Sequence, residues 1–350
     1  MGWEAAKIED IPRGNFNKLL FHPSFKRTID EINDLNIQLP PRPSPEEMDF
    51  GLYTFPPNGM LISNVEEIKS YRLDSDKGRE FITGGRPISA YDESVNKFAG
   101  LEGVAYLTSH ALVMHGEKDF IPSSFLTFYF YTRSKKLTKE AKFIKYSEDP
   151  ENQSKKDYVI DRTDFIINNT PTNSIVLIDG PLIGGQVSDL TIKLNNELLK
   201  KNAIPLFFVK NSTSNLVTDN INELKGRYNS DMHWAYKTLR KGERSNLFKY
   251  VDQHNPRNAK LFCYLKAFDL SPQRVEFHVS TFEKHKDKIG GLMDLVYYLM
   301  LVQGNLKNPQ VRSIAIAEKY ARASLKLINL DKLMKKLGVM PTMNQERFGW

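Results

Sequence analysis

The chain has 350 residues, with 49 Lys and Arg against 42 Asp and Glu, a net charge of +7 and a single cysteine, Cys263. One cysteine excludes a disulfide within the chain and a thiolate zinc cage, and it fits a reducing compartment. The basic surplus favours polyanionic partners, nucleic acid first, with a soluble protein that is merely basic as the alternative.

The sequence carries no evident signal for export or membrane insertion. The N-terminus, from Met1 to Ala6, lacks the apolar core of a signal peptide. The longest apolar run, residues 292–302, contains Asp294 and is far shorter than the roughly 20 residues that a membrane span needs. We therefore expect a cytoplasmic protein that does not bind membranes.

The N-terminal part is interrupted by prolines up to about Pro57. Residues 39–45 are especially rich in proline and are expected to be extended, close to polyproline II. We expect an N-terminal arm over residues 1–90 and one domain over residues 91–350.

The first part of that domain favours β-structure. Residues 97–116 and 125–131 are rich in β-branched and aromatic side chains and are predicted to form strands. Residues 134–156 are charged and contain Pro150, so we expect an exposed excursion there.

The clearest unit surrounds Asp179. A short aliphatic run, residues 175–178, ends in Asp179 and a Gly-Pro pair, which is typical of a buried strand with a carboxylate at its C-terminal end. A helix is predicted over 188–201, and a second strand over 203–209 leads into Lys210. Because strand, helix and strand form a crossover, the two strands should be parallel, with Asp179 and Lys210 at one sheet edge. Ligands bind at such edges, although a structural ion pair or a turn would also explain these residues.

The remaining predicted elements are a helix at 231–239 capped by Ser230, a strand pair at 260–266 and 274–279, and helices at 291–302 and 310–337.

Four further acids are candidates for a site. Glu318 lies near the middle of the apolar face of the last helix, where it either pairs with a base such as Arg312 or Arg322 or faces a site. Glu102 lies within a predicted strand, with a solvent-facing acid on an edge strand as the alternative. Asp161 and Asp164 precede an apolar run, and on a solvated helix or loop they would have no functional role.

Four segments together resemble the NurA family, archaeal and bacterial nucleases that work with the HerA hexameric ATPase. The segments are Val176 to Ile183, Ile204 to Asn211, Ser230-Asp231 with residues 241–248, and residues 264–266 with 274–277. Their order and spacing carry the resemblance, which covers roughly Lys97 to the C-terminus.

The resemblance implies an α/β fold, with an RNase H-like mixed β-sheet flanked by helices, to which this chain adds the N-terminal arm and a C-terminal helical segment. It implies a metal-dependent DNA nuclease acting in DNA end resection and recombinational repair, a homodimer, and a HerA-type ATPase as partner. Carboxylates would bind Mn²⁺ or Mg²⁺, the hard cations that oxygen ligands prefer.

The resemblance also suggests site residues. Asp179 matches the metal-binding aspartate of the family, and Lys210 matches its lysine. The first acid of the family stands in an Asp-Gly-Ser strand, and Glu102 is assigned to that place. The second acid falls at Asp161 or Asp164, and Glu318 stands where the family has a histidine. The expected catalytic residues are Glu102, Asp179, Lys210 and Glu318, and the expected metal ligands are Glu102, Asp161, Asp164 and Asp179.

The expected DNA contacts are Lys210, Lys241 and Arg244, whose charges would make binding weaken with salt. Two functions stay open at this point. Either Glu102 and Glu318 rebuild an active site, or the protein is a catalytically inactive relative that binds DNA or HerA structurally. A hydrolase with another substrate is a third alternative, because a fold does not fix a function.

Overall fold

The computed structural model describes residues 30–34, 62–67, 69–115, 120–139, 143–183, 187–252, 255–304 and 309–342. The chain divides into two compact units, Met1–Arg42 and Pro43–Trp350. In the first unit only residues 30–34 are described, and residues 30–33 are helical. The proline-rich stretch 39–45 lies outside the described residues.

The second unit contains both strands and helices. Its strands are β1 (Ile62–Asn64), β2 (Tyr71–Arg72), β3 (Ile88–Ala99), β4 (Val104–His115), β5 (Phe120–Thr132), β6 (Ile144–Tyr146), β7 (Ile175–Asp179), β8 (Ile204–Val209), β9 (Glu243–Arg244), β10 (Phe248–Val251), β11 (Ala259–Lys266) and β12 (Gln273–His278). Its helices are α2 (Ser75–Thr83), α3 (Pro150–Asn169), α4 (Ser188–Lys200), α5 (Asp231–Thr238), α6 (Val279–His285), α7 (Ile289–Gln303), α8 (Arg312–Leu325) and α9 (Leu330–Lys336).

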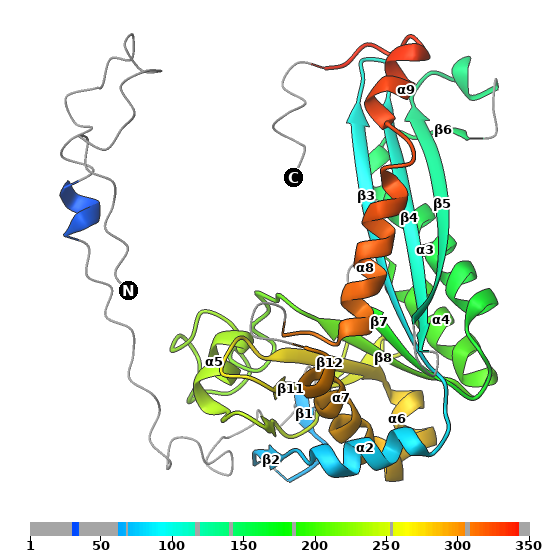
Figure 1. Ribbon diagram of the computed structural model, residues 1–350. Coiled ribbons are helices and arrows are strands. Elements are labelled where there is room, and N and C mark those ends of the chain that lie inside the picture. Colours follow the sequence, from blue (N-terminus) through cyan, green and yellow to red (C-terminus); the bar gives the residue numbers. More distant parts are fainter. Residues whose placement is uncertain are drawn as a thin grey trace, which may run out of the picture. The chain divides into compact units, whose positions relative to one another are not determined.

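All twelve strands of the described residues join one mixed sheet. The order is β1-β10-β11-β12-β8-β7-β3-β4-β5-β6, and β9 links β2 to β11. Strands β3, β7 and β8 are parallel neighbours, whereas β3, β4 and β5 form an antiparallel meander. Helices cover both faces of the sheet (Figure 1). The predicted α/β class, a mixed sheet flanked by helices, is confirmed.

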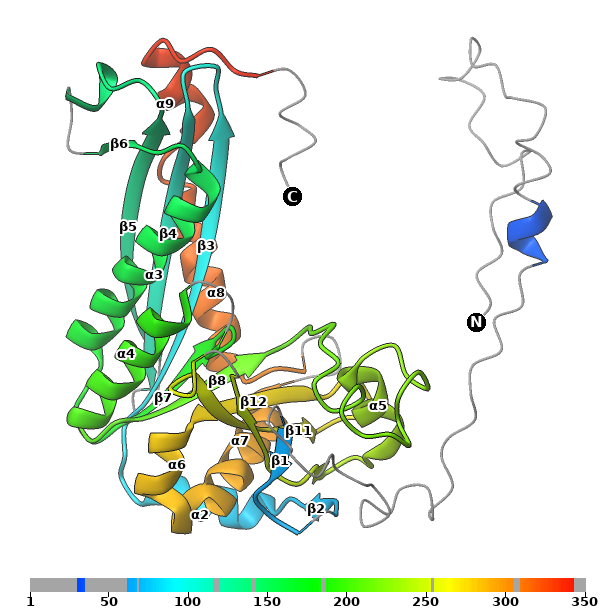
Figure 2. The same ribbon diagram turned by 180° about the vertical axis from the view of Figure 1, so that it is seen from behind.

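The meander is longer than the rest of the sheet. Strand β3 pairs with β7 only over Ile88–Tyr91, and beyond Tyr91 it pairs with β4 alone. Figure 1 shows β3, β4 and β5 rising from the lower sheet with α8 along one face, and Figure 2 shows α3 along the other. Buried alanines let α8 approach closely, because Ala317 and Ala321 pack against Ala111 on β4.

The boundary expected at residue 90 does not separate an arm from the domain. Strand β1 pairs with β10, β2 pairs with β9, and β3 begins at Ile88. Residues 62–90 therefore belong to the sheet of the second unit. The apolar residue Ile62, at the start of β1, is buried in the same core as Trp234, and short strands of this kind give little sequence signal.

The excursion expected over residues 134–156 ends earlier than predicted. Pro150 begins the 20-residue helix α3 instead of breaking the chain. Asp149 caps this helix, since its side chain accepts a hydrogen bond from the Asn152 amide. Proline is favoured in the first turn of a helix, where its missing N–H would have no partner anyway.

The helix predicted over 310–337 is two helices. α8 ends at Leu325, and α9 starts at Leu330 after a turn. The side chain of Asn329 caps α9 by accepting a hydrogen bond from the Lys332 amide at 2.8 Å. An N-cap residue inside a continuous apolar pattern is the signal that marks this break. None of the described helices is long and apolar enough to cross a membrane.

The middle strand of the meander, β4, carries a buried histidine. His110 on β4 is fully buried, its Nδ1 lies 2.7 Å from the Tyr91 hydroxyl, and its ring stacks on Tyr158. Burial lowers the pKa of His110 to about 3, and the nearby Arg162 guanidinium adds to the effect.

This histidine predicts a pH-dependent stability. The unfolded chain takes up a proton below pH 6.5 while the folded chain does not, so the free energy of unfolding falls as pH drops from about 6.5 towards 3. At pH 5 the loss is roughly 2 kcal/mol. In urea unfolding at pH 7 and pH 5, His110→Phe should reduce the stability difference between the two pH values by about this amount. An unchanged difference would show that another group controls acid sensitivity.

Candidate active site

Asp179 is the last residue of β7, and Gly180 ends that strand. Gly180 has a φ of +100°, which glycine adopts without strain, and its amide donates to the Phe208 carbonyl on β8 at 2.8 Å. In the parallel register Asp179 stands opposite Phe208, so Lys210 lies just beyond it. The predicted shared edge is confirmed, since Lys210 Nζ is 3.2 Å from Asp179 Oδ2.

A second carboxylate at this edge comes from β3 and was not predicted from the sequence. Tyr91 pairs with Ile178 in the parallel register, which places Asp92 beside Asp179. Because side chains alternate along a strand, Tyr91 points towards α3 and Asp92 points to the face that α8 covers. Asp92 is almost completely buried, and its Oδ2 lies 3.3 Å from Lys210 Nζ.

A third carboxylate comes from α8. Glu318 Oε2 lies 3.8 Å from Lys210 Nζ, and its Oε1 accepts a hydrogen bond from Arg322 at 2.5 Å. Both sequence alternatives for Glu318 therefore hold at once, because it pairs with Arg322 and also faces the edge shared by Asp179 and Lys210. The three acids, which lie far apart in the sequence, surround one ammonium group.

The charges of this cluster are not balanced. Burial raises the pKa of Asp92 to about 8, the Asp179 carboxylate adds to the rise, and Lys210 opposes it. Burial also raises the pKa of Asp179, again against the effect of Lys210. Burial disfavours the charged form of Lys210, but Asp92, Asp179 and Glu318 outweigh it and raise its pKa. Additional positive charge at this edge would therefore stabilise the ionised acids.

Glu102 is not part of the cluster. It lies in the turn between β3 and β4, where its Oε2 accepts a hydrogen bond from the Met340 amide. Strand β3 runs from Asp92 to Ala99 before this turn begins, a span of roughly 23 Å at about 3.3 Å per residue. The expectation that Glu102 shares a metal ion with Asp179 is therefore wrong. The resemblance had placed the Asp-Gly-Ser acid at Glu102, whereas Asp92-Glu-Ser94 on β3 retains its first and third residues.

Asp161 and Asp164 are also separate from the cluster, because α3 lies on the opposite face of the sheet (Figure 2). Asp161 accepts a hydrogen bond from the Tyr129 hydroxyl at 3.2 Å, and burial raises its pKa. Asp164 is exposed on the outer side of α3. The expectation that either acid is a metal ligand beside Asp179 is wrong, because the sheet lies between α3 and the cluster.

The expected DNA contacts have different surroundings. The buried Arg244 forms two hydrogen bonds to Glu66, at 2.7 and 3.0 Å, and its guanidinium covers the Tyr71 ring at 4.3 Å. Arg244 thus joins β9 to the N-terminal strands and is not available to bind phosphate. Lys241 is exposed, and Lys210 is held by the three acids, so their roles towards DNA stay predictions.

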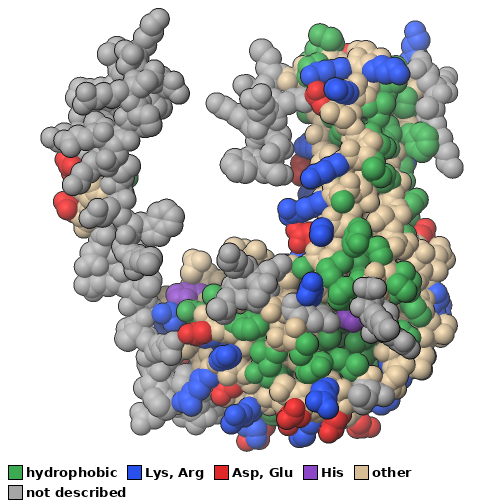
Figure 3. Space-filling model, in the orientation of Figure 1, with side chains coloured by type: hydrophobic (Ala, Val, Ile, Leu, Met, Phe, Trp, Pro, Cys, Tyr) green, Lys and Arg blue, Asp and Glu red, His purple; other side chains and the backbone are tan. Residues whose placement is uncertain are grey.

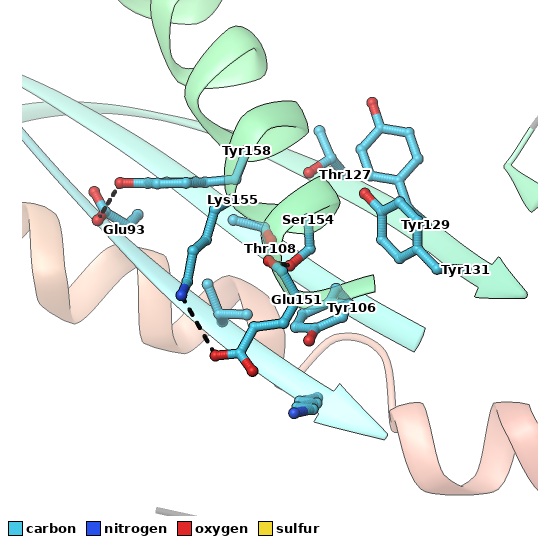
Figure 4. Close-up of a pocket in the computed structure, with 12 residues that line it drawn as sticks. Glu93, Tyr106, Thr108, Thr127, Tyr129, Tyr131, Glu151, Ser154, Lys155 and Tyr158 are labelled. Atoms are coloured by element: carbon cyan, nitrogen blue, oxygen red, sulfur yellow. Dashed lines mark hydrogen bonds and ion pairs between the residues drawn. The ribbon is translucent and has the colours of Figure 1, made fainter. Parts of the chain in front are cut away.

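A polar network lies on the α3 face of the sheet, opposite the face that carries the acid cluster. The Tyr158 hydroxyl donates to Glu93 Oε1 at 2.6 Å, and the buried Arg162 donates to Thr191 at 2.8 Å. A cavity of about 300 Å³ adjoins this network, between α3 and β3 to β5 (Figure 4). Tyrosines from β4, β5 and α3 line the cavity. Glu93, the residue directly after Asp92 on β3, also lines it. The cavity and the acid cluster therefore lie on opposite faces of β3.

The acid cluster suits a hard divalent cation by its chemistry. Carboxylate oxygens are the ligands that Mn²⁺ and Mg²⁺ prefer. Burial and the adjacent Asp179 carboxylate raise the pKa of Asp92, and a bound cation would oppose both effects. Within the described ranges, no three His, Cys, Asp or Glu side chains stand ready around a common metal position. The ammonium of Lys210 lies between the acids instead. Asp92 and Asp179 are the residues that would hold a cation, with Glu318 beside them.

The chain is similar to several proteins of known structure. Among solved structures, the NurA nuclease from Sulfolobus solfataricus is similar, with 13% identity, a TM-score of 0.44, and coverage of 79% of this chain and 88% of that chain. NurA with manganese has 10% identity, a TM-score of 0.37, and coverage of 71% and 92%. Endonuclease V from Bacillus subtilis has 8% identity, a TM-score of 0.36, and coverage of 70% and 83%.

No curated protein matches the sequence. The model of the NurA domain family matches residues 108–322, which is more than half of the chain. The match spans Asp179, Lys210 and Glu318, and it begins after Asp92. On this match the chain belongs to the NurA domain family.

Proposed function

We propose that this protein is a metal-dependent DNA nuclease of the NurA type. Family membership supports nuclease activity, and one structural observation carries the proposal. Asp92, Asp179 and Glu318 converge on Lys210 at the edge of the sheet where strands β7 and β8 end. Buried acids gathered around too little positive charge are typical of sites that bind divalent cations and phosphate esters.

The chain's own residues would divide the work. Asp92 and Asp179 would hold Mn²⁺ or Mg²⁺, which supplies an activated water and neutralises charge on the phosphate. The backbone amide of Glu93 donates to Asp92 Oδ1 at 2.8 Å and fixes the orientation of that carboxylate. Lys210 lies among the same acids, and its ammonium would stabilise the negative charge of the transition state.

The proposal includes the setting that the family resemblance implies. The nuclease would act in DNA end resection during recombinational repair, as a homodimer and beside a HerA-type hexameric ATPase. Membership in the NurA domain family is the support for this part. Co-purification of the chain with a HerA-type ATPase from the same genome would test the partnership.

A second candidate function is that of a catalytically inactive relative that binds DNA or HerA as a structural partner. The contacts of Glu318 favour it, because Arg322 and Lys210 both engage the carboxylate that stands in the family's histidine position. A carboxylate held between two bases is less free to serve a metal ion or a water molecule.

Cleavage of linear DNA by the purified full chain separates the two functions. With Mn²⁺ the wild type should degrade the DNA, and Asp179→Ala should reduce cleavage to background while DNA binding stays within about twofold. Equal, background-level cleavage by both proteins with Mn²⁺ and with Mg²⁺ would remove the nuclease proposal and leave the structural one.

A further inference from the structure

The basic surplus of the chain is concentrated on its last two helices. Between Arg312 and Lys336 there are seven basic residues and two acids, Glu318 and Asp331. By contrast, α3 carries three basic residues and four acids, and α4 carries two of each. The basic residues of α8, of its C-cap and of α9 are all exposed, and we call them the basic ridge: Arg312, Lys319, Arg322, Lys326, Lys332, Lys335 and Lys336.

The residues of the basic ridge on α8 lie in a row along one side of the helix. At 3.6 residues per turn, Arg312, Lys319, Arg322 and Lys326 fall on one side of α8, over a length of about 21 Å. The opposite side of α8 is buried against the sheet. Figure 3 shows the Lys and Arg side chains in a row over α8 and on towards α9.

The basic ridge passes beside the acid cluster, because Glu318 lies on α8 between Arg312 and Lys319. Lys319 follows Glu318 directly, and Arg322 forms an ion pair with the Glu318 carboxylate at 2.5 Å. From Arg322 onwards the ridge follows α8 along the meander towards α9 (Figure 1). A molecule lying on the ridge would therefore have one part at the site and the rest beside α8 and α9.

Few of these charges are neutralised within the protein. Among the described residues, the ion pairs of the ridge are Arg322 with Glu318 and Lys335 with Asp331, and the second pair is exposed. Exposed ion pairs contribute little, so they exchange readily for contacts with another anion. A row of regularly spaced cations over this length matches a chain of regularly spaced anions better than a single small ligand.

We propose that the basic ridge binds the sugar–phosphate backbone of DNA and guides the strand to the acid cluster. The ridge offers phosphate contacts, which position a strand without reading its sequence. It also supplies the attraction that the acid cluster lacks, because three carboxylates repel a phosphate. The direction of the strand at the site rests on the proposed nuclease function, whereas binding to the ridge does not.

The test uses DNA binding without divalent metal, so that no cleavage is needed. Lys326→Gln, Lys332→Gln and Lys336→Gln together remove three exposed charges distant from Glu318. The matched control combines Lys156→Gln, Lys193→Gln and Lys286→Gln, which removes three exposed charges from α3, α4 and the turn after α6. Fluorescence anisotropy of labelled DNA in chelator, over a salt series, gives the affinity and its salt dependence.

The ridge variant should bind DNA more weakly than the wild type. The slope of its log affinity against log salt concentration should also be less steep by about 2 to 3 units. Each lost phosphate contact reduces this slope by about 0.7 for single-stranded DNA and about 0.9 for double-stranded DNA. The control variant should match the wild type. Parallel measurements on single-stranded and double-stranded DNA assign the form that lies on the ridge. Oligonucleotides of about four nucleotides, too short to extend from the site to α9, should show no difference.

Equal salt slopes for wild type, ridge variant and control on both forms of DNA would overturn the proposal. The result is separable from the nuclease assay. If the wild type does not cut DNA but the ridge variant binds DNA more weakly, the ridge proposal stands and the nuclease proposal fails. If the wild type cuts DNA and the ridge variant binds DNA as well as the wild type does, the nuclease proposal stands and the ridge proposal fails.

Discussion

Replacing Asp92 by asparagine should lower manganese-dependent cleavage of linear DNA by about 1000-fold or more, which corresponds to about 4 kcal/mol of transition-state stabilisation. The reason is that Asp92 is the most buried acid of the cluster, and its neutral replacement cannot hold a divalent cation together with Asp179. Glu102→Gln should stay within about twofold of the wild type, because Glu102 lies at the far turn of the meander. Initial rates on one labelled substrate measure both.

The fold of the Asp92→Asn variant is expected to remain intact. Asparagine has the same shape as aspartate, and it removes the cost of keeping a carboxylate in a buried position. Calorimetric titration with Mn²⁺ and DNA binding in chelator complete the comparison, with loss of the first and retention of the second expected. The opposite pattern, in which Glu102→Gln stops cleavage and Asp92→Asn does not, would return the site to the far turn.

Replacing Glu276 by glutamine should destabilise the folded protein by about 3–5 kcal/mol. Glu276 on β12 is fully buried and lies between two bases, with Lys260 Nζ at 2.6 Å and Arg274 Nε at 2.8 Å, and its other oxygen accepts the Leu182 amide at 2.9 Å. The two bases lower the pKa of Glu276 although burial opposes them. Without its charge, two buried cations would face each other unpaired.

Urea unfolding at pH 7 measures this effect, with Asp331→Asn as the matched control. Asp331 pairs with Lys335 at 2.7 Å, but both side chains are about half exposed, at 54% and 56%. An exposed pair contributes about 0–1 kcal/mol, so the control should unfold close to the wild type. Similar losses in the two variants would mean that the Glu276 cluster is more hydrated than its burial indicates.

The part of the fold built from local patterns could be predicted from the sequence. The crossover from β7 through α4 to β8 was predicted because an aliphatic run, a helical repeat and a second aliphatic run follow one another closely. Parallel pairing then brought Asp179 and Lys210 together without any motif. Glu318 was found from its position on the apolar face of a helix, although the helix ends earlier than its pattern indicates.

The rest of the site depends on pairings that sequence patterns do not contain. Asp92 lies where β3 leaves β7, and the polar residues that follow it, such as Asn96 and Lys97, face solvent along an unpaired edge. A strand with one exposed edge does not show the continuous apolar run of a buried strand. Glu102, within a glycine-containing turn, was assigned because residues 101–104 resemble the Asp-Gly-Ser strand of the family. The register between β3 and β7 places Asp92, and not Glu102, beside Asp179.

The dispersal of the acids along the chain has a consequence for biosynthesis. Domains acquire their structure as they leave the ribosome, starting from the N-terminal side. Asp92 is synthesised more than 200 residues before Glu318 and the helix that carries it. A nascent chain can therefore assemble its sheet before it has the last acid or the cationic helices beside it, and competence to handle DNA should arise only after these helices have emerged.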